Sequence, residues 1–521
     1  MIGGGHNGLV AAAYLARAGQ SVLVLERGAE LGGATASRRV FPGVDARLSR
    51  YSYLVSLLPR RIVSDLALSF TTRRRAIASC TPYERDGSAR ALLLSHMDEE
   101  GSRTSFSALA SEADWRGYQH LLALEDAFAS KVWPSLLQPL RPRETWSAAF
   151  TTDLEREAWH AFVERPLGET LEKHIQNDLL RGLLFTDAKI GVFTHPHDPS
   201  LLQNRCFITH TIGDGTGEWR VPVGGMGALV DALWVSARTA GAEALTSAEA
   251  LRLVEGTPRH SVVFRHEGRD HEVGATRVLV NASPRVFASL LGLPSLPRPE
   301  DEGSVLKINM LLRRLPRFRA NELDPRDAFG GTLHVDEGYA EMDESYAQAA
   351  RGAVPDRIPF EVYCHTLTDD SILSPALREE GRHTLTLFGL DLPYSLFADD
   401  HDGRVRETVV RRALDGLNRV LAEPIEECLA LDAHGAPCIE AKTPLDLERD
   451  LALPRGSIFH GALSWFFAEG ADDGAWGVET PFARVYRCGS SAKRGGGVSG
   501  IPGHNAARRI FAERSASTLE G

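Results

Sequence analysis

Apolar and polar residues at the N-terminus follow a pattern that predicts a loop, a helix and a strand. The glycine-rich MIGGGHNG leads into the alanine-rich GLVAAAYLARAG, which favours a helix from Asn7 to about Ala18. The apolar run SVLVLE then predicts a short buried strand that ends in an acid at Glu26. Only Met1 and Ile2 precede the loop, although a buried strand worth roughly 8–15 kcal/mol is normally expected there. We therefore expect the natural chain to begin upstream of Met1, which intact-mass analysis of the native protein would check.

The pattern changes twice along the rest of the chain. After about Ala76 it predicts mixed helices and loops, including an amphipathic helix in ALASEADWRGYQHLLALEDAFASKVW. After Gly213 strand–helix–strand order returns, and VLVNAS predicts a buried strand ending in small residues. From about Glu302, the segments SVLKINMLLRRL, FEVYCHTL and HTLTLFGLDL alternate as in an antiparallel sheet with one buried face. The C-terminal VYRCGSSAKRGGGVSGIPGHNAARRIFAE predicts a strand, a glycine-rich loop and a helix beginning near Gly500. The chain as a whole is predicted to be α/β.

Length and charge narrow the class of protein. At 521 residues the chain is long for one core, so two or more domains are expected. A formal net charge of −11 provides no overall positive field for phosphates, which argues against a nucleic-acid partner. The basic runs Arg73–Arg75 and Leu311–Arg319 fit either a solvated face or a peripheral contact with anionic lipid. Both alternatives stay open.

Cysteine usage and hydropathy favour a cytoplasmic protein. The six cysteines include no CxxC pair, so their spacing excludes a dithiol redox pair and gives no zinc signature. Reduced thiols are the simplest state of such scattered cysteines. No apolar run of about 18 residues could span a bilayer, and no basic segment precedes GLVAAAYLA as in a signal peptide. We predict a cytoplasmic chain, with peripheral membrane contact left open, and no metal site.

The glycine loop carries the chemistry of a dinucleotide site. In GxGxxG, Gly3 permits a tight turn, Gly5 lets the backbone approach a pyrophosphate, and Gly8 lets the helix pack on the sheet. The helix directs its N-terminal amides at the phosphates. Glu26 can accept hydrogen bonds from a ribose diol, which disfavours NADP. The doublet Gly32–Gly33 fits either a simple turn or a further contact with the pyrophosphate. Neither GDGTG nor GGMG follows a strand with a terminal acid, so one such site is expected.

Ordered sequence blocks carry a resemblance to a known family. These blocks are GGGHNGLVAAAYLARAGQSVLVLE, SYLVSLLP, HPHDPS, WRVPVGGMGALVDAL, LPRGSIFHG and GGGVSGIPGHNAA. Together they resemble the phytoene-desaturase-like flavoproteins of the flavin amine oxidase superfamily, in particular the group of pyridine nucleotide-disulfide oxidoreductase domain-containing protein two. The resemblance spans essentially the whole chain.

The resemblance implies a two-domain architecture with FAD as cofactor. It implies a Rossmann-like FAD-binding domain at residues 1–75, 222–298 and 478–521, with a discontinuous α+β substrate domain at 76–221 and 299–477. The implied FAD-binding residues are Gly3, Gly5, Gly8, Glu26, Arg27, Gly32, Gly33, Ala250, Gly489, Ser490, Val498, Ser499 and Gly500.

The chain departs from the family pattern around the expected substrate pocket. The last loop reads GSSAKRGGGVSG, and ALSWFFAEG follows the FHG of residues 459–461, where an acid is common in the family. Lys493 and Arg494 therefore suggest a pocket unlike that of most relatives. His460, Trp465 and Phe467 are its predicted wall, although a core role for each of them stays open.

Lys307 is the predicted catalytic residue. GSVLKINMLLRRLPRF is similar to the strand of flavin amine oxidases that carries a lysine bound through water to flavin N5, and Lys307 falls on that position. An ammonium there would stabilise charge as dioxygen accepts an electron. The alternative is an edge-strand lysine that reaches solvent. His195 and His197 favour a turn, His6 is a weaker catalytic candidate, and Cys488 favours a buried thiol.

These features predict an FAD-dependent oxidoreductase of desaturase or amine oxidase type. It would move hydride from a C–H bond of a lipophilic or amine-bearing small molecule to flavin N5, with dioxygen or a quinone as electron acceptor. The alternative from another class is a flavin-binding interaction or regulatory protein with little turnover. Lys307 favours oxidation of an amine, whereas the family blocks favour carbon–carbon desaturation.

Overall fold

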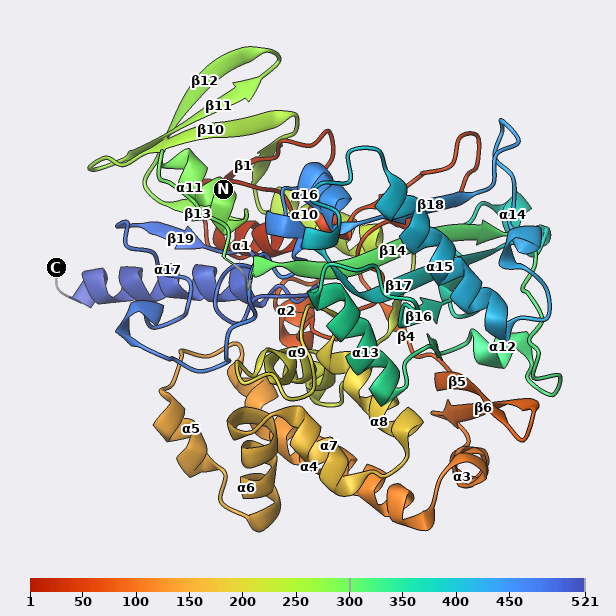
Figure 1. The fold of residues 1–521 in the computed structure, drawn as a ribbon. Coiled ribbons are helices and arrows are strands. Elements are labelled where there is room, and N and C mark those ends of the chain that lie inside the picture. The colour runs from red at the N-terminus through yellow and green to blue at the C-terminus, as the bar shows by residue number, and fades with distance from the viewer. Residues whose placement is uncertain (299–300, 520–521) are drawn as a thin grey trace.

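The computed structural model of the protein describes residues 1–298 and 301–519. A parallel sheet gathers strands from distant parts of this chain (Figure 1). Strand β1 (Leu23–Leu25) pairs with β9 (Glu243–Leu245), and β13 (Val278–Val280) pairs with β19 (Val485–Arg487). Ile2 bridges the two pairs, since it lies parallel to both Leu25 and Val280. The two residues before the glycine loop therefore occupy the central strand position between β1 and β13.

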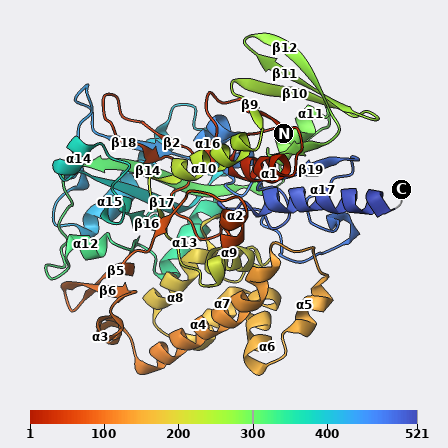
Figure 2. The same ribbon diagram turned by 180° about the vertical axis from the view of Figure 1, so that it is seen from behind.

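Three helices pack together beside this sheet. Helix α1 (His6–Arg17) contacts both α10 (Met226–Thr239) and α17 (Ile501–Leu519), and both views place it close to them (Figures 1 and 2). The helices expected at Asn7 and near Gly500 are thus confirmed to within a residue. The strands of this sheet come from all three segments expected for the FAD-binding domain. The exact domain limits remain a prediction. The limit between residues 298 and 299 adjoins residues outside the described part.

A second, larger sheet forms the other half of the molecule. Its strand order is β18-β14-β17-β16-β15-β5-β6, in which β15 and β5 run parallel and the other neighbours antiparallel. The strands are β5 (Ile77–Arg85), β6 (Ser88–Ser95), β14 (Gly303–Leu312), β15 (Thr332–Val335), β16 (Phe360–Tyr363), β17 (His383–Pro393) and β18 (Ile439–Lys442).

The expectation that this sheet buries one face is wrong. Every residue of β14 is buried, because its alternate side chains enter two different cores. Val305 packs into the core of the helical lobe, whereas Leu306 and Ile308 pack with Val409 and Leu417 of α15 (Arg404–Val420). A central strand covered on both faces normally reads as a continuous apolar run, and β14 departs from this pattern at the buried polar residues Ser304, Lys307 and Asn309.

A helical lobe lies against the large sheet, at the bottom of Figure 1. The amphipathic helix expected there is confirmed over Glu112–Val132, where the Ser111 hydroxyl caps its start by accepting a hydrogen bond from the Asp114 amide at 3.1 Å; only Ala108 and Leu109 of the expected segment belong to the preceding helix. The lobe contains α3 (Glu99–Leu109), α4 (Glu112–Val132), α5 (Arg143–Ala149), α6 (Asp153–Trp159), α7 (Leu167–His174), α8 (Asp178–Phe185) and α9 (Leu202–Thr211).

The remaining elements connect or flank these layers. Strands β10 (Ala248–Val254), β11 (His260–His266) and β12 (Arg269–Ala275) form the antiparallel sheet at the top of Figure 1. Among the described residues, no helix is both long and apolar enough to cross a membrane. The other elements are β2 (Ser37–Arg38), β3 (Leu48–Ser49), α2 (Arg60–Asp65), β4 (Thr72–Arg73), β7 (Gly191–Val192), β8 (Val221–Pro222), α11 (Pro284–Leu290), α12 (Pro325–Ala328), α13 (Tyr339–Ala350), α14 (Pro375–Glu379) and α16 (Pro444–Leu451).

Candidate functional site

A cavity of about 910 Å³ joins the parallel sheet, the large sheet and the helical lobe. One end is lined by Gly3 and Gly5 of the glycine loop, and the other by Tyr118 and Glu125 of α4. Lys307 of β14 lines the same cavity. Its size suits a large organic ligand.

The three loop glycines differ in what the surrounding structure requires at each position. Gly3 has a φ of +93°, and a Cβ there would lie 2.4 Å from the Asn281 carbonyl oxygen. A Cβ on Gly8 would lie 2.5 Å from the Gly3 oxygen, so both glycines serve the packing of the loop. Gly5 is extended, with φ −71° and ψ 168°, and its Cβ would meet only the Asn281 Nδ2 at 3.1 Å and the Gly32 oxygen at 3.9 Å. The backbone conformation does not require glycine at position 5, and the missing side chain leaves the backbone open to the cavity.

The acid that ends β1 is held in place by backbone amides. Glu26 Oε2 accepts a hydrogen bond from the Gly4 amide at 2.8 Å, and Oε1 accepts one from the Gly28 amide at 2.7 Å. An ionised carboxylate has about four acceptor sites, so each oxygen can still accept from a ligand in the cavity that it lines. Arg27 also lines the cavity, and its Nη2 donates to the Asp450 carbonyl at 3.1 Å.

The structure brings most of the predicted nucleotide residues to this cavity. The predicted residues that line it are Gly3, Gly5, Glu26, Arg27, Gly32, Gly33, Ala250, Ser490 and Val498. The others pack behind the lining: a Cβ on Gly489 would lie 2.6 Å from Asn281 Oδ1, Ser499 is buried, and Gly500 has a φ of +71°. The start of α10 is already occupied, since Met226 and Gly227 donate their amides to Ser49 and Ser37 hydroxyls.

Lys307 is not the solvent-reaching edge residue of the alternative interpretation. It is buried in β14, between β18 and β17, and its Nζ donates to the carbonyl oxygens of Ser49 at 2.8 Å and Tyr51 at 2.5 Å. Nζ also lies 4.6 Å from the centre of the Tyr53 ring. Burial holds the pKa of Lys307 well below its usual value. The two carbonyl oxygens fix Nζ as a donor, and in its ammonium form the group has one further donor.

Carboxylates from three segments line the other end of the cavity. They belong to Glu125 of α4, Asp187 after α8, and Glu361 of β16. Removal from water raises the pKa of Glu125 to about 8, that of Asp187 to about 6 and that of Glu361 to about 8. Glu361 accepts hydrogen bonds from the hydroxyls of Tyr363 and, at 3.3 Å, Thr186.

This carboxylate group is connected to Lys307 through aromatic rings. The Tyr53 ring that faces Lys307 lies 5.0 Å from the ring of Tyr363, whose hydroxyl donates to Glu361. Arg75 also lines the cavity, and it donates to the Thr332 hydroxyl at 2.9 Å and the Trp219 carbonyl at 3.3 Å. His334 Nδ1 lies 3.9 Å from Glu361 Oε1. Sequence analysis did not find the carboxylates, because they come from three distant segments without a local motif.

Burial lowers the pKa of each of the five histidines that line the cavity, His6, His96, His210, His334 and His460. His6 and His460 both line it, and burial lowers the pKa of each to about 4. The Thr35 hydroxyl lies 2.8 Å from His6 Nδ1. His460, one of the three residues predicted to form the pocket wall, lines this cavity. A histidine with this pKa is a poor acceptor of protons near neutral pH.

The aromatic segment after His460 turns away from the cavity. Trp465 and Phe467 stack on each other at 5.5 Å in the core of the helical lobe, and neither lines the cavity. Arg494 is buried and donates to the carbonyls of Ser135, Gln138 and Trp476, so it ties the last loop to the lobe. Lys493 pairs with Glu469 and Asp473. These four residues support the fold around the site from outside the cavity lining.

Three other candidates also lie outside the cavity lining. The amide of Asp198 donates to the His195 carbonyl in the predicted turn, and His197 pairs with Glu172 at 2.7 Å. Cys488 is a buried free thiol, as are the other five cysteines. The absence of a disulfide among these six, all within the described residues, agrees with the missing CxxC spacing.

The glycine loop, the parallel sheet and the helices beside it define a protein with a Rossmann-like domain. A family profile described as an NAD(P)-binding Rossmann-like domain matches residues 1–60. The mouse pyridine nucleotide-disulfide oxidoreductase domain-containing protein 2 is 31% identical, over 98% of this chain and 92% of the mouse protein. The chain belongs to that family. A relative from Mycobacterium tuberculosis, named as an uncharacterized protein, is 46% identical over 98% of this chain and 96% of its own length.

Solved structures show where this fold recurs. Putrescine oxidase bound to putrescine matches with a TM-score of 0.57 and 17% identity, over 99% of this chain and 98% of that one. Cyclohexylamine oxidase from Brevibacterium oxydans matches with a TM-score of 0.53 and 15% identity, over 99% and 98%. At this identity the likeness concerns the fold, which the chain shares with these two proteins.

Proposed function

We propose that the chain is an FAD-dependent oxidoreductase that oxidises a C–H bond next to the nitrogen of a cationic amine. The observation that carries the proposal is the continuity of one cavity from the glycine loop, past Lys307, to the carboxylates of Glu125, Asp187 and Glu361. Relatives and fold neighbours named as oxidoreductases and amine oxidases support the class of reaction. The FAD portion would comprise residues 1–75, 222–298 and 478–521.

The residues at the loop end fit FAD. Gly5 leaves open the space that a Cβ would fill, beside the amides at the start of α1, where a pyrophosphate is favoured. Glu26 offers acceptors for a ribose diol, and Ala250 lies in the wall where an adenine would pack. Ser490 and Val498 line the cavity from the last loop and would contact the flavin. Bound FAD supplies a hydride acceptor at flavin N5.

Lys307 would act on the charge that develops during reoxidation. Its Nζ is fixed by two carbonyl oxygens and removed from water, so it is oriented before reaction. A fixed donor in a site of low dielectric stabilises a developing anion more strongly than one in water does. This role favours dioxygen as acceptor, with a quinone as the alternative.

The carboxylates favour an amine over an apolar polyene. A hydrocarbon would leave the three acids desolvated without compensation, whereas an ammonium group would pair with them. Desolvation is the first cause of their raised pKa values, and a bound ammonium group would lower those values. The neutral histidines leave the hydride step without a strong base, so positioning over the cofactor supplies most of the effect.

Anaerobic reduction tests this proposal. The purified protein should show a flavin absorption spectrum, with FAD released on denaturation, and excess diamine should bleach it faster than a polyene does. A protein that stays colourless with added FAD would refute the cofactor. Bound flavin that no amine or polyene reduces, together with a stable protein partner, would support instead a flavin-binding interaction protein.

A further inference from the structure

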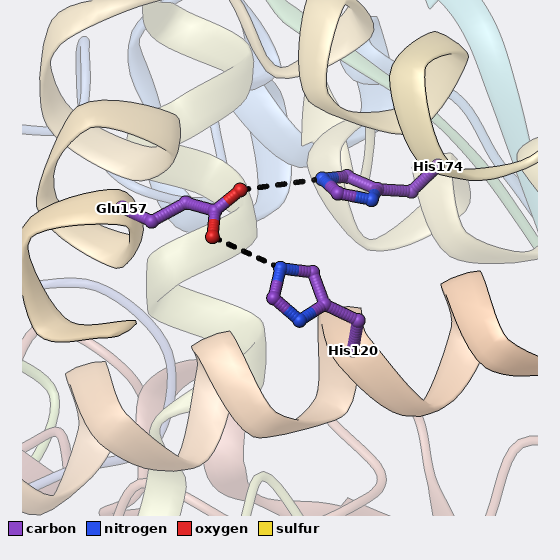
Figure 3. Close-up of side chains that lie close together, drawn as sticks. All are labelled: His120, Glu157 and His174. Atoms are coloured by element: carbon purple, nitrogen blue, oxygen red, sulfur yellow. Dashed lines mark hydrogen bonds and ion pairs between the residues drawn. The ribbon is translucent and has the colours of Figure 1, made fainter. Parts of the chain in front are cut away.

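Two histidines and a glutamate converge on the outer side of the helical lobe. They are His120 of α4, Glu157 of α6 and His174 of α7, and Figure 3 shows both imidazole rings directed at the one carboxylate. His120 Nε2 lies 3.0 Å from Glu157 Oε2, and His174 Nε2 lies 3.5 Å from Glu157 Oε1. One ligand atom from each residue lies within 4.8 Å of the other two. Sequence reasoning missed this group, because its members are far apart along the chain.

The chemistry of these atoms is that of metal ligands. His174 Nε2 is shielded from solvent and makes no hydrogen bond with any described residue, although it points at the carboxylate. The two rings lie 4.7 Å apart between centroids, close enough to serve one ion. Two imidazole nitrogens and a carboxylate oxygen form a donor set that zinc prefers.

We propose that His120, Glu157 and His174 form a zinc-binding site that ties α4 to α6 and α7. Zinc bonds of about 2.0–2.2 Å in a tetrahedron set neighbouring ligand atoms about 3.3 Å apart. The observed nitrogen–oxygen distances of 3.0 and 3.5 Å lie on either side of that value, and each involves a different oxygen of the Glu157 carboxylate. Three protein ligands leave the fourth position to water. The site is separate from the proposed oxidation chemistry and does not depend on it.

Lys173 competes for the same carboxylate. Its Nζ donates to Glu157 Oε1 at 2.8 Å, but its side chain is 64% exposed and can move into solvent. Without metal, the group is a surface ion-pair cluster of small energetic value. All six cysteines are buried, so they offer no competing thiolate at the surface. Removing the Lys173 ammonium should therefore strengthen zinc binding.

A metal bound at this site would also affect the cavity, because helix α4 belongs to both. Helix α4 also carries Tyr118, Leu122 and Glu125, which line the cavity. A metal that fixes His120 to two neighbouring helices would restrain that wall. Zinc should then raise the midpoint temperature of unfolding, because it binds the folded arrangement and not the unfolded chain.

The test is calorimetric titration of the tag-free, FAD-loaded protein with zinc chloride after treatment with a chelator. We expect saturable binding of one ion, at least about tenfold weaker in His120→Ala and in His174→Ala. Lys173→Met should bind more tightly than the unchanged protein. His160→Ala is the matched control, because His160 pairs with Glu164 alone at 3.1 Å on the same lobe and should leave affinity unchanged.

Unfolding midpoints with and without zinc, with circular dichroism of each variant, separate loss of ligand from loss of fold. Glu157→Gln provides an independent variant that keeps the side-chain volume. The proposal is overturned by absence of saturable zinc binding, or by unchanged affinity in folded His120→Ala and His174→Ala proteins.

Discussion

Substitution of Gly5 by alanine isolates the requirement of a ligand from the requirement of the fold. The backbone at Gly5 is extended, with φ −71° and ψ 168°, so an L-residue fits without strain. The added methyl group meets Asn281 Nδ2 at 3.1 Å, which a shift of the side-chain amide by a few tenths of an ångström relieves. We expect the free energy of unfolding without FAD to change by less than about 1 kcal/mol.

The same methyl group should weaken FAD binding strongly. It projects into the cavity beside the first turn of α1, where the pyrophosphate is expected to approach the backbone. Moving a phosphate away from one amide removes a charge-assisted hydrogen bond worth about 1.5–3 kcal/mol. That loss corresponds to an increase in the FAD dissociation constant of about ten- to hundredfold.

Two measurements on each protein are needed: thermal unfolding without FAD, and titration of FAD followed by quenching of flavin fluorescence. Gly19→Ala is the control, because Gly19 has a φ of +75° with no atom within 4 Å of its Cβ and lies outside the cavity lining. It should lose about 1 kcal/mol of stability and keep its FAD affinity. If Gly5→Ala binds FAD as tightly as the unchanged protein, the loop does not hold the pyrophosphate. If it unfolds without FAD, glycine there serves the fold instead.

Three further substitutions test other parts of the site. Gly3→Ala should destabilise the protein even without FAD, by about 2 kcal/mol or more, since its Cβ would lie 2.4 Å from the Asn281 oxygen at φ +93°; an unchanged unfolding midpoint would contradict this. Lys307→Met should keep FAD but slow reoxidation by dioxygen about 100-fold in stopped-flow absorbance, and an equal rate would remove Lys307 from that step. Glu125→Gln should weaken binding of a diamine about tenfold or more while it raises the unfolding midpoint of the ligand-free protein near pH 8. The sign follows from the raised pKa of about 8: the folded protein keeps a proton that the unfolded chain releases above its ordinary value, so stability falls as pH rises through this range, and glutamine abolishes that fall. If stability fell with rising pH equally in both proteins, Glu125 would not be the group responsible for that fall.

Contiguous features of the site could be predicted from the sequence, and dispersed ones could not. The glycine loop, Glu26 and the helix after them lie within one stretch, so spacing alone fixes their geometry. Lys307 could be placed on a strand by pattern, but the carbonyl oxygens of Ser49 and Tyr51 that hold it come from a distant segment. The sequence also did not predict where the Trp465 side chain points, because it packs in the core of the helical lobe against residues from distant segments. Tertiary contacts between distant segments decide these positions, and no local pattern encodes them.

The carboxylates also bear on the choice between an enzyme and a flavin-binding partner protein. Glu125, Asp187 and Glu361 share a partly desolvated cavity, where their mutual repulsion and burial oppose folding. A protein that used FAD only as a structural ligand would gain stability if apolar residues replaced these acids. Desolvated acids that oppose stability are characteristic of binding and catalytic sites. Their position at the end of the cavity opposite the glycine loop is where the substrate of a flavin enzyme would lie. The energetic cost of these three side chains is therefore an argument for turnover of a cationic substrate.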